Sequence, residues 1–206
     1  EAISEAFKQR SFQLLILGYF VCGFQVVFIG VHLAPYLKDM SATYPDVGHP
    51  QVATLALALV GLFNVLGTYY AGVLGQKIPK HYILAFIYGS RSVVIGAFLL
   101  LPLSPLTTYL FAALMGILWL STVPLTNGIV AQIFGVKYLS MLSGFAFFSH
   151  QIGSFMGAYL GGVLFDKTGS YNIVWIIAIA LGILAAMVNL PIKEDAIDRD
   201  ANLAKA

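Results

Sequence analysis

Six stretches of mostly apolar residues follow one another along the chain, and short polar segments rich in Pro and Gly separate them. They run over approximately Phe12–Leu37, Val52–Leu74, Tyr82–Leu101, Thr107–Phe134, Leu139–Phe165 and Ile173–Leu190. A helix of about 20 apolar residues crosses a lipid bilayer. Strands of membrane barrels alternate in short runs, which these segments do not do. The sequence therefore predicts an all-α polytopic membrane protein with six transmembrane helices.

The scarcity of charge supports lipid as the solvent. Only 10% of the residues are charged and 59% are hydrophobic, whereas soluble domains carry about a quarter charged residues. The net charge of +2 is too small to indicate nucleic acid as a partner. Cys22 is the single cysteine, so no disulfide can form within the chain and cysteine usage does not indicate a compartment.

The basic residues of the short loops predict the orientation of the bundle. With the first residue inside, the inner segments hold eight Lys and Arg residues and the outer loops hold two, Lys38 and Lys167. We therefore expect residues 1–11 to be a cytoplasmic lead-in, 12–190 the transmembrane bundle and 191–206 a cytoplasmic tail, with residues 193–206 as a solvated, disordered end. The chain starts with Glu and shows no signal peptide, which favours a fragment whose true start lies upstream.

One phrase occurs twice. "GTYYAGVLGQKIP" begins at Gly67 and "GAYLGGVLFDKTG" begins at Gly157, and six of the first eleven positions are identical. The first copy ends the second span and the second copy ends the fifth span. Since three spans are an odd number, the second triplet enters the membrane from the opposite side. This is a 3+3 inverted repeat, a common plan of secondary transporters, although chance similarity of Gly-rich helix ends is the alternative.

The two copies resemble the signature loop of major facilitator superfamily transporters, which reads approximately G-x-L-x-D-x-x-G-R-K. The first copy keeps Gly72, Leu74 and Lys80, but has Gln76 at the acidic position and Pro79 at the second glycine. The second copy keeps the matching positions Gly162, Leu164, Asp166 and Gly169. The strings "STVPLTNGIVAQIFG" and "FSHQIGSFMGAYLGG" resemble bacterial transporters of the monocarboxylate and oxalate–formate branch.

This resemblance implies the C-terminal six-helix half of a transporter in the bacterial inner (plasma) membrane. Its partner would be an N-terminal six-helix half that is missing here. A small-molecule substrate, such as a monocarboxylate or a similar organic anion, would bind between the halves near mid-membrane and move by alternating access. The first helix of each triplet would line the path, the second would lie at the interface, and the third would face lipid. No cofactor and no metal are expected.

His150, about midway along the fifth span, is the first candidate for the substrate or proton pathway. An ionisable group at this depth is costly to expose to hydrocarbon, and imidazole titrates near neutral pH. It could take a proton, bind a carboxylate or donate a hydrogen bond, with Gln151 beside it and Ser154 on its own helix face. The alternative is a neutral histidine that only ties helices together.

Arg91, in the middle of the third span, is the second candidate. A guanidinium can grip a carboxylate with two hydrogen bonds, which suits an organic anion. Because the third span should be peripheral and no Asp or Glu lies within the six spans, we favour structural or gating use. Its countercharge would be the missing half, a backbone carbonyl or the substrate.

Uncharged amides at membrane depth are further candidates, and Gln25 and Asn127 rank above Asn64 because they lie on the helices expected to line the path. Such amides bind polar solutes, but they also serve as ordinary interhelical contacts. Pro124 can kink the fourth span, as happens in discontinuous transporter helices. A histidine at the outer end of the first span, His32, is interpreted as a solvated boundary residue, with a gate role as the weaker option.

Glycines at every fourth position of the fifth span are expected to serve helix packing, because they let another backbone approach closely. They are Gly153, Gly157 and Gly161. The loop charges near Lys77 and Asp166 read as solvated boundary groups, and the family's conformational latch is in doubt where Gln76 replaces the acid.

Two other function classes were weighed. A membrane enzyme such as an intramembrane protease needs a Ser–His pair or two carboxylates at membrane depth, and no recognisable motif of either kind is present. A homo-oligomeric six-helix channel or structural protein remains as an alternative. We expect no enzyme activity and predict transport of a small solute, with proton coupling or exchange both open.

Overall fold

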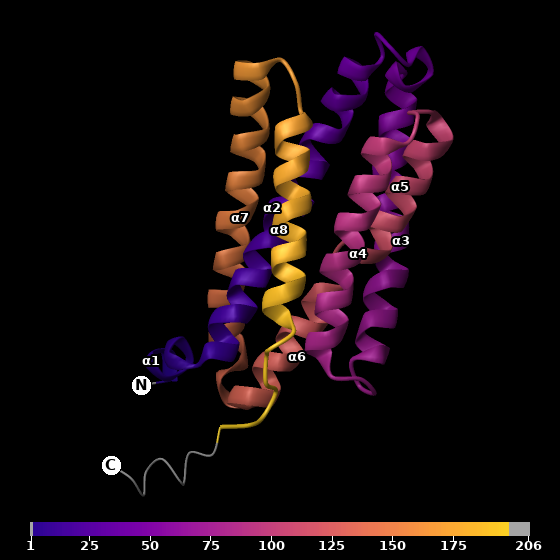
Figure 1. Cartoon of the computed structure of the whole chain (residues 1–206). Helices are drawn as coiled ribbons and strands as arrows, with labels where there is room; N and C mark the ends of the chain where they lie inside the picture. Colours follow the sequence, from indigo (N-terminus) through magenta and orange to yellow (C-terminus); the bar gives the residue numbers. More distant parts are fainter. Residues whose placement is uncertain (1, 198–206) are drawn as a thin grey trace, which may run out of the picture.

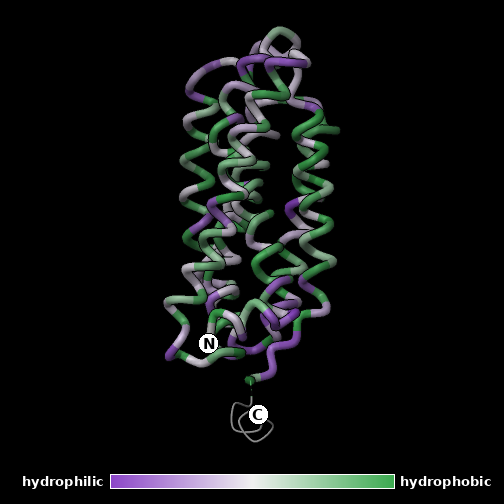
Figure 2. Tube along the Cα trace, turned by 90° about the vertical axis from the view of Figure 1, so that its left-hand side faces the viewer, coloured by the Kyte–Doolittle hydropathy of each residue, from purple (hydrophilic) through white to green (hydrophobic). Residues whose placement is uncertain are grey.

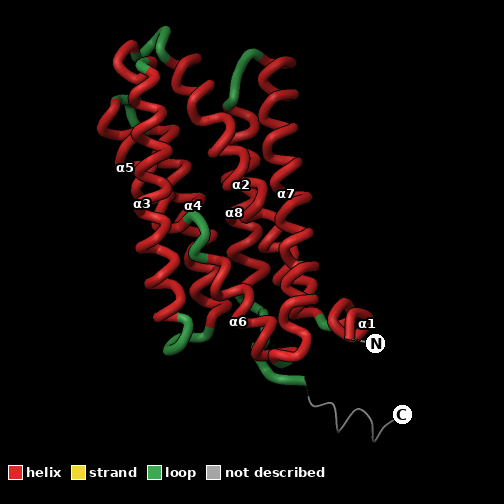
Figure 3. The backbone as a smooth tube through the Cα atoms, turned by 180° about the vertical axis from the view of Figure 1, so that it is seen from behind, coloured by secondary structure: helices red, strands yellow, loops and turns green. Residues whose placement is uncertain are grey.

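The computed structural model describes residues 2–197, and these residues form helices joined by short loops (Figures 1 and 3). Eight α-helices and two short 3₁₀ turns occur in this part of the chain, and no strand does. In order they are α1 Ala2–Lys8, α2 Arg10–Met40, η1 Pro45–Gly48, α3 Pro50–Leu74, α4 Lys80–Leu100, α5 Pro105–Leu118, α6 Thr122–Phe134, η2 Val136–Tyr138, α7 Leu139–Thr168 and α8 Asn172–Asn189.

Local signals explain where several helices begin and end. Ser104 and Thr107 form a reciprocal capping box at the start of α5, with Pro105 at its first position. Gly169 ends α7 in the left-handed conformation at φ 67°, which a residue without a Cβ adopts at little cost. Hydrophobic positions run along the middle of the bundle and hydrophilic ones gather at its ends (Figure 2).

Five membrane-length helical paths in the described chain are long and apolar enough to cross a membrane. They are Arg10–Met40, Pro50–Leu74, Lys80–Leu100, Pro105–Phe134 and Asn172–Asn189, where the fourth combines α5 and α6. The expected fifth span, α7, has 30 residues but is not among them. Its sequence carries Ser149, His150, Gln151 and Ser154, which lower its hydropathy. The expected count of six spans therefore stays a prediction.

The helices pair in a regular way. α2 packs along α7, α3 along α5, and α4 along α8, while α2 also contacts α8 and α4 also contacts α5. In Figure 1, α2, α7 and α8 stand on one side and α3, α4 and α5 on the other. This pairing is unchanged when α2, α3 and α4 exchange places with α5, α7 and α8, in that order.

The closest helix contacts repeat this exchange at the level of single atoms. A Cβ at Gly157 would collide with the carbonyl oxygen of Phe24, and one at Gly67 would collide with that of Ile117. Gly67 and Gly157 are the aligned first residues of the repeated phrase. Gly157 therefore lets α7 touch the backbone of α2, and Gly67 lets α3 touch the backbone of α5.

A second pair of contacts is related in the same way as the contacts of Gly67 and Gly157. A Cβ at Gly23 would collide with the carbonyl of His150, and one at Gly116 would lie 2.8 Å from that of Val60. His150 and Val60 are related by the same shift as Gly157 and Gly67. The crossings of α2 with α7 and of α5 with α3 are thus equivalent.

Residues 191–197 lie against the bundle, although the sequence predicted a solvated, disordered end from residue 193. Ile192 is buried, the Lys193 N–H donates to Ser11 Oγ at 3.0 Å, and the Ile197 N–H donates to the Ile133 carbonyl at 3.0 Å. Residues 193–197 are thus ordered by hydrogen bonds to the bundle, while Lys193 and Asp195 remain exposed as expected. The rest of the predicted tail lies outside the described residues.

Candidate functional site

The fourth membrane path, predicted as one helix over Thr107–Phe134, is broken between α5 and α6. Pro124 has no N–H and its ring cannot sit beside the carbonyl four residues earlier, which explains a break just before it. Backbone groups at helix ends lack partners within the helix, and at membrane depth they need partners from elsewhere. We call residues 119–121 the joint.

Arg91 from α4 supplies hydrogen bonds to the carbonyl side of the joint. Its Nη2 donates to the carbonyls of Leu118, at 2.6 Å, and Trp119, at 2.5 Å, and its Nε donates to Leu118 at 3.1 Å. The side chain is fully buried, and no carboxylate pairs with it in residues 2–197. The end of α5 carries a partial negative charge, so a cation there is favourable. Arg91 therefore has backbone carbonyls as its countercharge.

Two amides complete the joint. Asn64 Oδ1 on α3 accepts from the Leu120 N–H at 3.0 Å. Gln25 on α2 accepts from Arg91 Nη1 at 3.4 Å and donates to the Ala178 carbonyl of α8 at 2.8 Å. Asn64 and Arg91 thus bond backbone groups at the joint, and Gln25 in turn bonds Arg91.

A cavity of about 350 Å³ opens beside the joint, with walls from α2, α6 and α7. It is lined by Tyr19, Leu120, Val123, Asn127, Ser143, Gly144, Phe147 and His150. The polar groups that face it are a phenol, an amide, a hydroxyl and an imidazole, and no carboxylate or fixed cation is among these lining residues. Such a wall can offer hydrogen bonds to a small polar solute.

Two polar atoms of this cavity wall are buried without a hydrogen-bond partner in the described structure, His150 Nε2 and Ser143 Oγ. The other ring nitrogen of His150 lies 3.3 Å from Gln151 Oε1 and 3.4 Å from Ser154 Oγ. His150 is only 6% exposed, and its ring packs 4.9 Å from that of Tyr19. The Cys22 thiol also interacts with the imidazole of His150. Buried polar groups are nearly always paired, but three further unpaired atoms of the described chain lie away from this cavity, Thr126 Oγ1, Trp175 Nε1 and Asn189 Oδ1. The polar lining, and not the unpaired atoms alone, therefore makes this cavity the candidate site.

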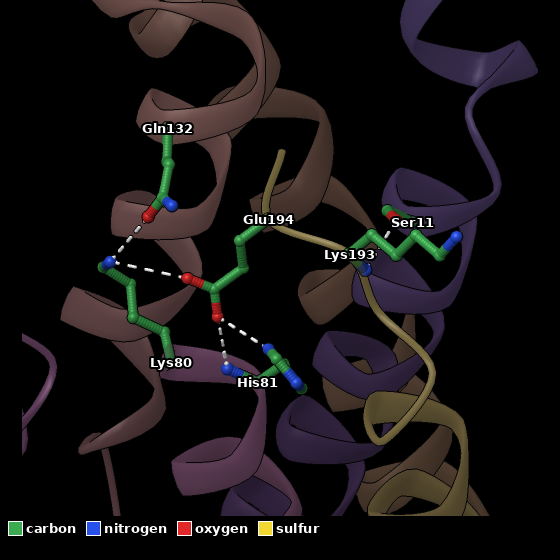
Figure 4. Close-up of polar contacts among 6 residues, drawn as sticks. All are labelled: Ser11, Lys80, His81, Gln132, Lys193 and Glu194. Carbon is green, nitrogen blue, oxygen red and sulfur yellow. Dashed lines mark hydrogen bonds and ion pairs between the residues drawn. The ribbon is translucent and has the colours of Figure 1, made fainter. Parts of the chain in front are cut away.

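A second polar cluster lies at the end of the bundle where the described chain begins and ends (Figure 4). Glu194 Oε1 accepts from the backbone N–H and from Nδ1 of His81, both at 2.8 Å. Lys80 Nζ lies 3.6 Å from Glu194 Oε2 and donates to Gln132 Oε1 at 2.8 Å. The loop between α3 and α4 has Gln76 where the signature of the superfamily has an acid. Glu194, from residues 191–197, supplies a carboxylate at the end of this loop instead.

Residues 15–205 match the sequence profile of the Major Facilitator Superfamily. The chain belongs to this superfamily. It is also 27% identical over 188 residues to a Bacillus subtilis (strain 168) protein described as the uncharacterized MFS-type transporter YcxA. That alignment covers 89% of this chain and 44% of the relative, so the chain spans less than half the length of the curated relative it matches.

Membership of the Major Facilitator Superfamily agrees with the five long apolar paths and makes the chain part of an integral membrane protein. The superfamily and the named relative are transporters and not enzymes. The branch expected from the quoted strings, monocarboxylate and oxalate–formate transporters, is not tested by these matches and stays a prediction.

The structure brings some of the candidate residues together and separates others. His150 and Asn127 line the same cavity. Gln25, Arg91 and Asn64 instead surround the joint, where their polar atoms are used by protein groups. Gln151 is exposed on α7 next to His150.

Sequence reasoning missed Tyr19 and Ser143, which complete the cavity. Ser143 lies seven positions before His150, and helical periodicity places residues with this spacing on one face, so a signal was present. Tyr19 carried no signal beyond its place on a helix expected to line the path.

His32 is buried, although a solvated boundary residue was expected. Its Nε2 lies 2.9 Å from the Ala158 carbonyl of α7, and a Cβ at Gly161 would collide with its ring. Gly153 and Gly157 approach the carbonyls of Phe20 and Phe24 in the same way. The glycine stripe of α7 therefore packs against α2 of the same bundle. No group of three or more potential metal ligands occurs in the described chain.

Proposed function

We propose that this chain is one six-helix half of a secondary transporter that moves a small organic anion, such as a monocarboxylate, by alternating access. The observation that carries the proposal is the cavity beside the joint, whose lining includes the polar side chains of Asn127, Ser143 and His150. A passing solute would form hydrogen bonds with these three side chains.

The helix contacts support a half built from two inverted triplets, with α7 as the fifth span. The exchange-symmetric pairing of helices and the equivalent contacts of Gly67 and Gly157 are what such a repeat requires. The alignment to 44% of a transporter sequence is compatible with a partner half of similar size. That half would close the cavity from its other side.

The chemistry of the cavity supports an anion whose charge is met by hydrogen bonds and by His150. No carboxylate lines it to repel an anion, and Arg91 is occupied by the joint. Imidazole can carry a proton near neutral pH. A charged His150 would bind a carboxylate, and its proton would travel with the solute in a proton-coupled cycle. Exchange of two anions is the other mode that this arrangement allows.

The basic loops support a location for the protein. Both described ends of the bundle lie at one end of the molecule (Figure 1), and Lys77, Lys80 and Lys193 line one hollow together with residues 190–195. The positive-inside rule favours the cytoplasm for this end. We propose that the protein lies in the plasma membrane of a bacterium.

Uptake by vesicles tests the proposal. Radiolabelled lactate and oxalate would be offered to vesicles that hold the protein containing this chain, with and without a pH gradient. We expect uptake above that of empty vesicles, and we expect His150→Ala to reduce it at least about tenfold, which is the usual scale for a buried polar contact. The matched control is His49→Ala, which removes an exposed histidine at the other end of the bundle. Uptake and pH dependence that are unchanged in His150→Ala would contradict the site.

A further inference from the structure

Arg91 and the joint depend on one another. A buried guanidinium is costly unless its donors are satisfied, and those of Arg91 are used on Leu118, Trp119 and Gln25. The two carbonyls in turn belong to the end of α5, where no helical N–H is available. Neither side can leave without exposing unpaired polar groups at membrane depth.

The opposite side of the joint is held as well. The Leu120 N–H donates to Asn64, and the Ser121 hydroxyl donates to the Ile117 carbonyl. Cys22 Sγ lies 3.3 Å from Thr122 Oγ1, the first residue of α6. Asn64 of α3 thus bonds a backbone N–H of the break and Arg91 of α4 bonds its carbonyl groups, while Cys22 of α2 contacts the side chain of Thr122.

The joint also forms part of the cavity wall. Leu120 lies within the joint, and Val123 and Asn127 follow it on α6, all facing the cavity opposite His150. A displacement of the joint would move these three side chains together.

We propose that Arg91 and Asn64 are positioning residues, which hold the break at 119–121 in place so that α6 presents Leu120, Val123 and Asn127 to the solute. Arg91 itself does not touch the solute. The role in solute handling rests on the proposed function, whereas the clamping of the joint does not.

We call the hydrogen bonds of Arg91 and Asn64 to the joint the clamp. Alkylation of Cys22 by N-ethylmaleimide tests the clamp without any solute. Cys22 is fully buried and contacts Thr122 at the start of α6 and His150 of α7, so its thiol reacts when this packing beside the joint opens. The assay uses the protein containing this chain in membrane vesicles, with any cysteine outside the chain replaced by serine. Arg91→Met removes every donor at similar length, and we expect alkylation at least about tenfold faster than in the wild type.

Three variants sharpen this result. Arg91→Lys keeps the charge but not the fork that reaches two carbonyls, so it should restore the slow rate in part. Asn64→Leu releases the joint from the other side and should also speed alkylation, and it decides the matter if Arg91→Met does not reach the membrane. Ser92→Ala is the matched control, because this buried neighbour bonds the Ile179 carbonyl of α8 and should leave the rate unchanged.

A second reporter separates a local clamp from general loosening. The buried apolar residues form two clusters, and Cys22 and Leu33 of α2 belong to different ones. Leu33→Cys in a Cys22→Ser background therefore places a thiol at a fully buried position away from Cys22. We expect Arg91→Met to leave its alkylation unchanged. Equal acceleration at positions 22 and 33, or no acceleration at position 22 in Arg91→Met and Asn64→Leu, would overturn the clamp. Fast alkylation without any uptake of lactate or oxalate would uphold the clamp and reject the proposed solute.

Discussion

Arg91 and His150 show two different fates of an ionisable side chain at membrane depth. Arg91 uses its donors on the carbonyls of a helix break and on Gln25. His150 lines a cavity, and its Nε2 is buried without a hydrogen-bond partner in the described structure. An ionisable group at membrane depth is costly, and the two residues meet this cost differently. Backbone carbonyls satisfy Arg91, whereas His150 lines the cavity that we propose holds the solute.

These two residues also show how far the sequence alone could lead. His150 was recognised because a histidine is rare within an apolar span. The partner of Arg91 could be narrowed only to a carbonyl, the substrate or the missing half, because free carbonyls exist only where a helix breaks. Pro124 signalled a kink, but the sequence did not reveal that α4 faces it.

At the end of the bundle, Glu194 joins residues 191–197 to the start of α4. Glu194→Gln keeps the shape but removes the charge that Lys80 and the α4 N-terminus favour, so we expect a loss of about 1–2 kcal/mol in stability. Thermal unfolding of the purified protein in detergent measures this. Asp195→Asn is the matched control, because this neighbouring acid is exposed and its replacement should leave the thermal stability unchanged. Equal effects of the two variants would show that Glu194 has no special contact.

At the scale of helices, the glycine crossings hold the bundle together. Gly67→Ala and Gly157→Ala each put a methyl group against a backbone carbonyl of the facing helix. We expect each to destabilise the protein by about 1–3 kcal/mol, because a close-packed crossing must separate. The two losses should be similar, since the contacts are equivalent. Thermal unfolding in detergent is the measurement.

The repeated phrase supplies its own controls for this prediction. Gly72 and Gly162 are also aligned in the two copies, and a Cβ at either position meets nothing within 4 Å. Gly72→Ala and Gly162→Ala should therefore leave stability unchanged or slightly higher. A loss at these positions as large as at Gly67 and Gly157 would show that helix crossings are not the cause.

Element boundaries were largely predictable because each apolar run is long and ends at Pro, Gly or charged residues. The helices extend beyond the predicted spans by a few residues, as in α2, which continues to Met40. The division of the fourth path and the ordered segment 191–197 were not predictable in detail, because both depend on contacts between distant residues. The same holds for the cavity, whose lining comes from three helices.

For the whole molecule, the central claim is that the cavity between α2, α6 and α7 is a water-accessible solute path within the membrane. Its symmetric architecture supports a transporter half, and the superfamily match agrees with it. The polar lining at Asn127, Ser143 and His150 would then contact water from one membrane face at a time.

Thiol labelling at Ser143 tests this claim most directly. In a Cys22→Ser background, Ser143→Cys would be exposed to a membrane-impermeant thiosulfonate in right-side-out and inside-out vesicles. Leu142→Cys is the matched control, because Leu142 is fully buried one position away. We predict that Ser143→Cys reacts from at least one face and at least about tenfold faster than Leu142→Cys, in line with a water-lined wall. No reaction at position 143 from either face, or equal reaction at positions 142 and 143, would contradict the account.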